Sequence, residues 1–280
     1  MDTVDLVLKS GTIVTPYNRI RAGVAVDEGK IVLVGKESHL PSASTVINAE
    51  GKHILPGLID AHVHLRDPGN PESEDFGNGT MAAALGGITT VFDMPGTIPS
   101  VLSKEVLEDK VRLIQHKAFI DFGLYGGAIG ENLQELEGLA RAGAIGFKTY
   151  MPRGTSYSVN DDLSLFKVFE RSARTNLPCC VHAESGYLID YLVEKLRAQG
   201  RRDAMAHVES RPSFVEAEAI SKAIILAKAS GARLHIVHMS TSEGVQLVQS
   251  ARATGQNVTA ETCPQYLLVT ADEMNRRGPY

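Results

Sequence analysis

The pattern of apolar and polar residues changes at about residue 52. Before that point, glycine-containing turns such as Ser10-Gly11 and Asp27-Glu28-Gly29-Lys30 separate short β-rich runs. The runs cover residues 5–14, 24–26, 31–34 and 45–48. Turns of this kind between such runs are typical of hairpins. Residues 1–52 are therefore predicted to form a small β-domain.

From residue 53 onwards, strand patterns alternate with helical patterns. The predicted strands cover residues 58–64, 89–94, 119–125, 145–150, 179–182, 234–238 and 258–261. The helical patterns cover residues 77–85, 104–116, 133–142, 163–175, 213–230 and 243–254. This alternation, without a Gly-x-Gly-x-x-Gly turn, predicts an α/β fold in which residues 53–280 form a TIM-type (β/α) barrel. Seven of its eight strands are present, so we expect the eighth beyond Tyr280, or another element in its place.

Composition limits the classes of function. The chain has 280 residues and a net charge of −5, with no basic stripe for a nucleic acid. It shows no secretory signal and no apolar run of the ~18 residues that a membrane span needs. The three cysteines have no metal-ribbon spacing, and this fits a reducing cytoplasm. We therefore expect a cytoplasmic protein without nucleic-acid or membrane partners.

Two histidines, His62 and His64, stand at the end of the apolar run ILPGLIDAHVH. Residues i and i+2 of a strand point to the same face, so both imidazoles aim at one place. Two such imidazoles can chelate a metal ion. For an H-x-H pair alone, solvated or hydrogen-bonded histidines are the simpler interpretation.

Further polar residues close other predicted strands. Lys148 ends the fourth, His182 the fifth and His238 the sixth. A single strand-end histidine is usually a hydrogen-bonded core residue, and a single lysine is usually a surface cation. Functional residues of a barrel gather at this end, however, and four histidines there favour a metal site. Burial beside metal ions favours a neutral Lys148 amine, which can react with carbon dioxide to give a carbamate suited to bridging two ions.

These motifs resemble the cyclic amidohydrolases, which include dihydroorotase, hydantoinase (dihydropyrimidinase) and allantoinase. The resemblance covers essentially the whole chain, and PGLIDxHxH at residues 56–64 is specific to the wider superfamily. It implies that His62 and His64 bind one divalent ion, most often zinc, and that His182 and His238 bind a second. Carbamylated Lys148 would bridge the two ions, which activate water to hydrolyse a ring amide.

Three signals bear on the ring that is hydrolysed. Arg66, in HLRDPG, resembles the dihydroorotase arginine that grips the substrate carboxylate, although an arginine on a mobile loop is the alternative. Gly96, in DMPGT, departs from dihydroorotases, which usually carry asparagine there. The segments FKTYM, HAE and ETCPQYL resemble hydantoinases, and SRP at 210–212 is shared with hydantoinases and allantoinases. The prediction is a dihydroorotase-like ring of pyrimidine metabolism first, then hydantoin or dihydropyrimidine, then allantoin.

The loop at residues 152–161 follows Lys148 and is rich in turn formers, so it is a candidate lid or specificity loop. Its Tyr157 either faces the substrate or is a solvated loop residue.

No residue takes the role of the family's general base, an aspartate expected beyond Tyr280. Asp272 and Glu273 are predicted to be solvated acids on a surface helix. The resemblance implies a homo-oligomer acting on a small cyclic ureide. The chain alone is expected to be poorly active and to aggregate through its open edge, and a non-catalytic scaffold is the alternative from another class.

Overall fold

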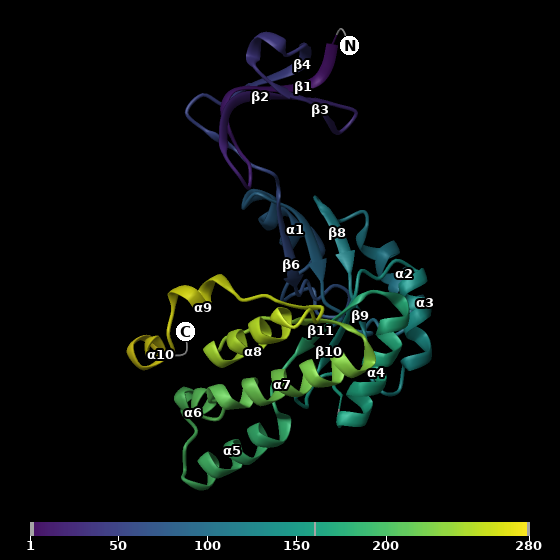
Figure 1. Cartoon of the computed structure of the whole chain (residues 1–280), viewed down its shortest axis with the longest axis vertical. Helices are drawn as coiled ribbons and strands as arrows, with labels where there is room; N and C mark the ends of the chain where they lie inside the picture. The colour runs from purple at the N-terminus through teal and green to yellow at the C-terminus, as the bar shows by residue number, and fades with distance from the viewer. Residues whose placement is uncertain (1–2, 160, 279–280) are drawn as a thin grey trace. The chain divides into compact units, whose positions relative to one another are not determined.

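The computed structural model describes residues 3–159 and 161–278 (Figure 1). The chain divides into two compact units, Met1–Leu58 and Ile59–Tyr280. The predicted division after residue 52 stays a prediction.

The first unit is the predicted β-domain. Its elements are β1 (Thr3–Val14), β2 (Arg19–Asp27), β3 (Lys30–Gly35), η1 (Glu37–His39), β4 (Ser42–Asn48) and β5 (His53–Ile54). The sheet order is β3-β2-β1-β4, and β5 also pairs with β1. Glu28 and Gly29 turn between β2 and β3 with φ of 48° and 73°, the left-handed backbone that such two-residue hairpins need.

The predicted Ser10-Gly11 turn is wrong. β1 runs through this point, and its register with β2 shifts between Leu8 and Gly11. Ser10 has φ of 62° at the shift. A bulge and a turn both use a left-handed residue beside glycine, so the local sequence does not distinguish them.

The second unit contains the strands of the predicted barrel. They are β6 (Leu58–Val63), β7 (Ile88–Asp93), β8 (Asp121–Leu124), β9 (Gly126–Gly127), β10 (Phe147–Tyr150), β11 (Pro178–His182), β12 (Arg233–Ile236) and β13 (Val258–Ala260). Their orders are β6-β7-β8 and β13-β12-β11-β10-β9. Only Tyr125 separates β8 from β9, so together they occupy one strand position. The described residues thus contain seven strand positions, as predicted.

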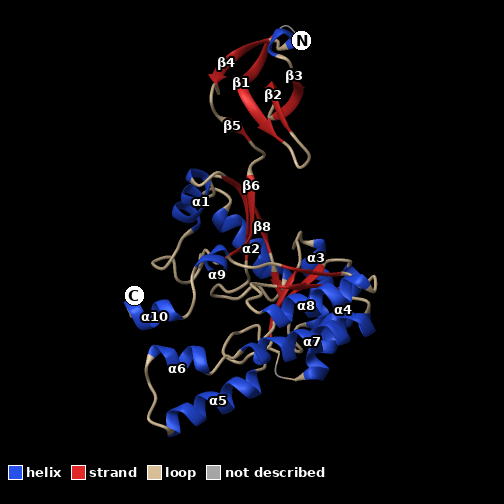
Figure 2. Ribbon diagram, turned by 60° about the vertical axis from the view of Figure 1, so that its left-hand side comes forward, coloured by secondary structure: helices blue, strands red, loops and turns tan. Residues whose placement is uncertain are grey.

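Helices cover the strands on the outside, as Figure 2 shows in blue and red. The predicted helical patterns correspond to α1 (Phe76–Leu85), α2 (Lys104–Ile114), η2 (Leu133–Glu135) with α3 (Leu136–Arg141), α4 (Asp162–Thr175), α7 (Ser213–Ser230) and α8 (Ser242–Ala253). Four of these helices begin at a side chain that accepts a hydrogen bond from a first-turn N–H, which fixes the helix start. These caps are Asp75, Ser103, Asp161 and Thr241.

No helix was predicted over α5 (Gly186–Ala198), α6 (Ala204–Glu209) or α9 (Pro264–Leu268). Of the α5 side chains only Ile189 is buried, although Ile189, Leu192, Val193 and Leu196 recur at helical spacing. The predicted surface helix around Asp272 is confirmed as α10 (Asp272–Arg277), where Glu273 pairs with Arg276 and Arg277.

The core of the second unit lies between the strands and their helices. Phe147, Cys179 and Val181 are fully buried on β10 and β11, and Phe169 of α4 and Ile220 of α7 belong to the same cluster. Strands buried on both faces suit parallel sheets covered by helices. In residues 3–159 and 161–278, no helix has the length and apolar character to cross a membrane.

Candidate metal centre

Four imidazoles form a continuous row at the carboxyl ends of the strands. The ring centres of His64 and His62 lie 5.3 Å apart, and those of His62 and His238 also lie 5.3 Å apart. His238 and His182 follow with centres 4.5 Å apart. The structure therefore brings together four residues that are up to 176 positions apart in the sequence (238 − 62).

His238 lies two residues beyond the end of the observed strand β12 (Arg233–Ile236), although it was predicted to close that strand. That strand was expected over 234–238, but β12 ends at Ile236. His238 has φ of 38°, and Arg66 has φ of 49°. Left-handed backbone is uncommon for residues other than glycine and is kept where the surroundings hold it, often at functional sites.

Lys148 lies on β10 with only 2% of its surface exposed. Its Nζ has no hydrogen-bond partner, although it is buried. Burial lowers the pKa of Lys148 to about 8, because the charged form loses its hydration. An unpartnered buried amine is costly, so this side chain points to a group that the protein chain does not itself supply.

Three of these imidazoles, those of His64, His182 and His238, are held in the neutral form. Burial, assisted by the nearby positive groups, lowers the pKa of His64 to about 3 and that of His238 to about 3. Burial also lowers the pKa of His182, against the opposing effect of Glu184. His64 Nδ1 is buried without a partner. Neutral imidazole is the form that binds a metal ion.

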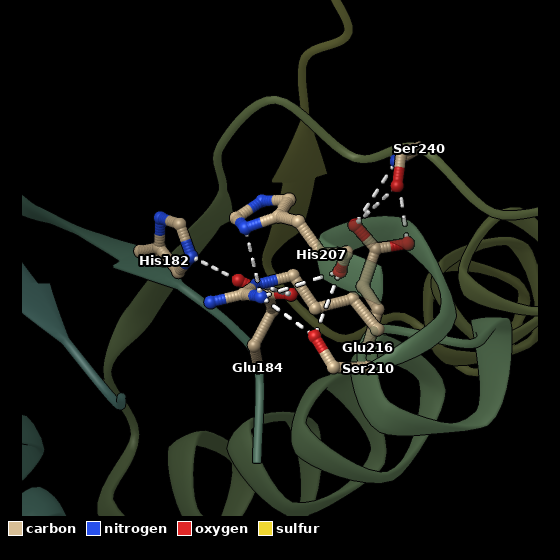
Figure 3. A network of polar contacts seen from close by, with 7 residues as sticks. His182, Glu184, His207, Ser210, Glu216 and Ser240 are labelled. Carbon is tan, nitrogen blue, oxygen red and sulfur yellow. Dashed lines mark hydrogen bonds and ion pairs between the residues drawn. The ribbon is translucent and has the colours of Figure 1, made fainter. Parts of the chain in front are cut away.

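Two carboxylates each contact one of these imidazoles. Glu261, directly after β13, contacts His62 Nδ1 with one oxygen and lies 3.2 Å from His235 Nε2 with the other. Glu184 Oε2 lies 2.7 Å from His182 Nε2, a contact drawn in Figure 3. The sequence analysis did not assign either glutamate to the site. Both follow the carboxyl end of a strand, so the rule that found the histidines would also have found them.

The donor set fits a metal centre. In the described part of the chain, no three His, Cys, Asp or Glu side chains already stand as a group able to hold an ion. His62 and His182 nevertheless each keep one ring nitrogen free of a carboxylate, and His64 Nδ1 and Lys148 Nζ have no partner. Imidazole nitrogens and the oxygens of a lysine carbamate are donors that zinc accepts.

Arg66 lies beside Gly96 and Tyr157. Arg66 Nη1 donates to the Gly96 carbonyl at 3.2 Å. A Cβ at position 96 would lie 3.1 Å from Tyr157 Oη and 3.3 Å from Arg66 Nη1. A side chain at position 96 would therefore require Tyr157 or Arg66 to shift by a few tenths of an ångström.

Tyr157 is 6% exposed, so the solvated-tyrosine alternative is wrong. Its loop folds back on β10, where Tyr150 N donates to Tyr157 O at 3.1 Å. Asn160, in the candidate lid, lies outside the described residues.

Comparison with known proteins identifies the family. The model of the amidohydrolase family matches residues 53–276. The chain belongs to the amidohydrolase family. This amidohydrolase is 39% identical over 279 residues to an allantoinase of Deinococcus radiodurans, covering 99% of this chain and 62% of the relative. It is 36% identical to an allantoinase of Escherichia coli O1:K1 / APEC, covering 98% of this chain and 62% of the relative.

A comparison with solved structures also finds a cyclic amidohydrolase. The L-hydantoinase (dihydropyrimidinase) from Arthrobacter aurescens matches with a TM-score of 0.95 and 34% identity, over 99% of this amidohydrolase and 62% of that chain. These comparisons confirm the predicted cyclic-amidohydrolase resemblance and the barrel fold. The amidohydrolase spans 62% of the length of these relatives. Their names match the alternatives ranked behind dihydroorotase, and the dihydroorotase preference stays a prediction.

Proposed function

We propose that this amidohydrolase hydrolyses a C–N bond in a cyclic ureide with the help of two divalent ions. Zinc is the first candidate for these ions. His62 and His64 would hold one ion, His182 and His238 would hold the other, and a carbamate on Lys148 would serve both. The observation that carries the proposal is the buried, unpartnered Lys148 amine beside the neutral imidazoles of His64, His182 and His238. The relatives named allantoinase and hydantoinase support the same reaction class.

The chain's own residues prepare the site. A pKa of about 8 makes a larger neutral fraction of the Lys148 amine available near neutral pH than an exposed lysine has. The Nζ lone pair would form a bond to the carbon of carbon dioxide while the electron pair of one C=O π bond moves to its oxygen, and the nitrogen would release one proton to water. The resulting anion offsets the positive charge of the ions. When bound, the ions supply a nucleophilic water and polarise the ring carbonyl.

Two observations bear on the substrate. The names of the relatives favour a neutral ring such as allantoin or hydantoin. Arg66 favours dihydroorotate as a second candidate, because a guanidinium pairs well with a carboxylate and the other two rings carry none. Arg66 is half-buried and donates a hydrogen bond to the Gly96 carbonyl, which supports a substrate-binding role over that of an arginine on a mobile loop.

The test is a comparison of four rings on the zinc-loaded chain, purified with bicarbonate. Ring opening of allantoin, hydantoin, dihydrouracil and dihydroorotate is followed by mass spectrometry. We expect measurable turnover of one ring, and its loss together with loss of zinc in Lys148→Ala. Lys104→Ala, on the exposed side of α2, is the control. Wild-type zinc content and turnover in Lys148→Ala would contradict the proposal.

A further inference from the structure

Glu261 connects two histidines, His62 and His235. One carboxylate oxygen contacts His62 Nδ1, and the other lies 3.2 Å from His235 Nε2. His235 is itself anchored, because its Nδ1 lies 2.8 Å from Thr259 Oγ1 on β13. Since an ionised carboxylate only accepts hydrogen bonds, His62 Nδ1 must carry the hydrogen. The lone pair of His62 therefore lies on Nε2.

Glu184 contacts the other type of ring nitrogen, Nε2, in His182. Its Oε2 lies 2.7 Å from Nε2 of that ring, so Nε2 carries the hydrogen and Nδ1 keeps the lone pair. Arg211 lies behind the glutamate, with Nε 3.7 Å from Glu184 Oε1. Arg211 in turn donates to Ser210 Oγ at 3.0 Å. Figure 3 shows the carboxylate of Glu184 between His182 on one side and Ser210 and His207 on the other.

The two carboxylates therefore fix different tautomers in two histidines of one row. The rings of His62 and His182 both adjoin His238, at 5.3 Å and 4.5 Å between centres. Each glutamate comes from a segment that follows a strand, and each is held from behind by a second polar side chain. A free imidazole would exchange its tautomers, whereas these two rings each present one defined nitrogen.

We infer that Glu261 and Glu184 are positioning residues that select Nε2 of His62 and Nδ1 of His182 as the metal-binding nitrogens. The inference rests on the proposed metal centre and adds which atom of each ring binds. Outer carboxylates of this kind fix the orientation of a ligand histidine and raise its basicity, and their loss typically lowers metal affinity about 10–100-fold.

The experiment measures zinc affinity by chelator competition on the full 280-residue chain. The variants are Glu261→Leu, Glu184→Leu, and Glu→Gln at each site, because glutamine keeps a carbonyl acceptor. Glu137→Leu is the control, since Glu137 pairs with Arg171 at 3.0 Å rather than with an imidazole. Melting of the metal-free variants and the visible spectrum of cobalt-loaded protein are recorded in parallel.

We expect each leucine variant to bind zinc about 10–100-fold more weakly and to change the cobalt spectrum, while the glutamine variants and Glu137→Leu bind like wild type. A purely structural role would lower melting and leave the affinity of the folded protein unchanged. That result, or wild-type affinity in both leucine variants, overturns the inference. If a leucine variant does not fold, the glutamine variant at the same site decides. Zinc binding by that glutamine variant about 10–100-fold weaker than wild type also overturns the inference. Failure of the wild type to bind zinc overturns the metal centre itself.

Discussion

Lys148 is the residue whose position is hardest to explain by stability alone. Its amine is buried and has no partner, and burial lowers its pKa from 10.5 to about 8. This shift corresponds to about 3 kcal/mol of destabilisation of the charged form. This cost destabilises the folded metal-free protein relative to the unfolded chain, because the same ammonium is hydrated in the unfolded chain. Selection for function, with a loss of stability, is the simplest physical reason for keeping it.

We predict that Lys148→Met raises the free energy of unfolding of the metal-free chain at pH 7 by about 3 kcal/mol. The folded pKa lies below the unfolded pKa, so the wild-type penalty is complete below about pH 8 and is relieved as the pH rises towards 10.5. The difference between variant and wild type should shrink over that range. Urea unfolding at pH 7 and pH 10 measures it, with Lys104→Met as control. A variant no more stable than wild type at pH 7 would show that the amine has a partner in solution.

The sequence revealed the histidines and Lys148 because each closes a predicted strand, a position that periodicity can locate. It did not reveal the roles of Glu261 and Glu184, because a glutamate after a strand reaches in several directions. Which imidazole it contacts depends on the spacing of strands far apart in the chain. The left-handed backbone of His238 also depends on the packed surroundings rather than on the residue type.

At the scale of elements, one buried ion pair connects α2, β7 and the segment after β6. Lys110 of α2 pairs with Asp93 of β7, and both side chains are almost fully buried. Asp93 Oδ1 also accepts a hydrogen bond at 2.8 Å from the N–H of Leu65, the residue after His64. Burial raises the pKa of Asp93, against the opposing effect of Lys110. The pair therefore holds the backbone that follows the two histidines.

We predict that Lys110→Met destabilises the chain by about 3–5 kcal/mol, because it leaves the Asp93 carboxylate buried and unpaired. The double variant Lys110→Met/Asp93→Asn should recover most of this loss, since the asparagine oxygen still accepts from Leu65. Thermal and urea unfolding of the wild type, the two single variants and the double variant form the cycle. Equal losses in Lys110→Met and in the double variant would mean that the charge is not the cause.

The sequence predicted best those elements that bury one clear face. α7 has the predicted limits, and α4 differs by one residue at its start. α5 was missed although Ile189, Leu192, Val193 and Leu196 recur at the spacing of a helix face. The strands were found but drawn slightly long at their carboxyl ends, as at β12, because the polar residues of the site continue the apolar pattern after the ladder has ended.

At the scale of the whole molecule, the sheet edges remain open. Within residues 3–159 and 161–278, β6 pairs only with β7, and β13 pairs only with β12. Ile59 on β6 is 62% exposed, and Leu58 beside it is also exposed. Unpaired strand edges with apolar side chains readily pair with another chain. The contact from Glu261 to His62 joins the ends of these two strands through side chains, without a backbone ladder.

We therefore predict that the 280-residue chain associates beyond the monomer as its concentration rises, and that Ile59→Lys reduces this association. A charge on an edge strand opposes pairing with a second chain. Leu113→Lys is the matched control, because Leu113 is an exposed apolar residue on α2 and not on a strand edge. Sedimentation velocity at several concentrations distinguishes the three proteins. Equal association of wild type and Ile59→Lys, with less in Leu113→Lys, would place the contact on the helices. In that case the predicted homo-oligomer would use the outer face of the barrel and leave the edge free for a further strand.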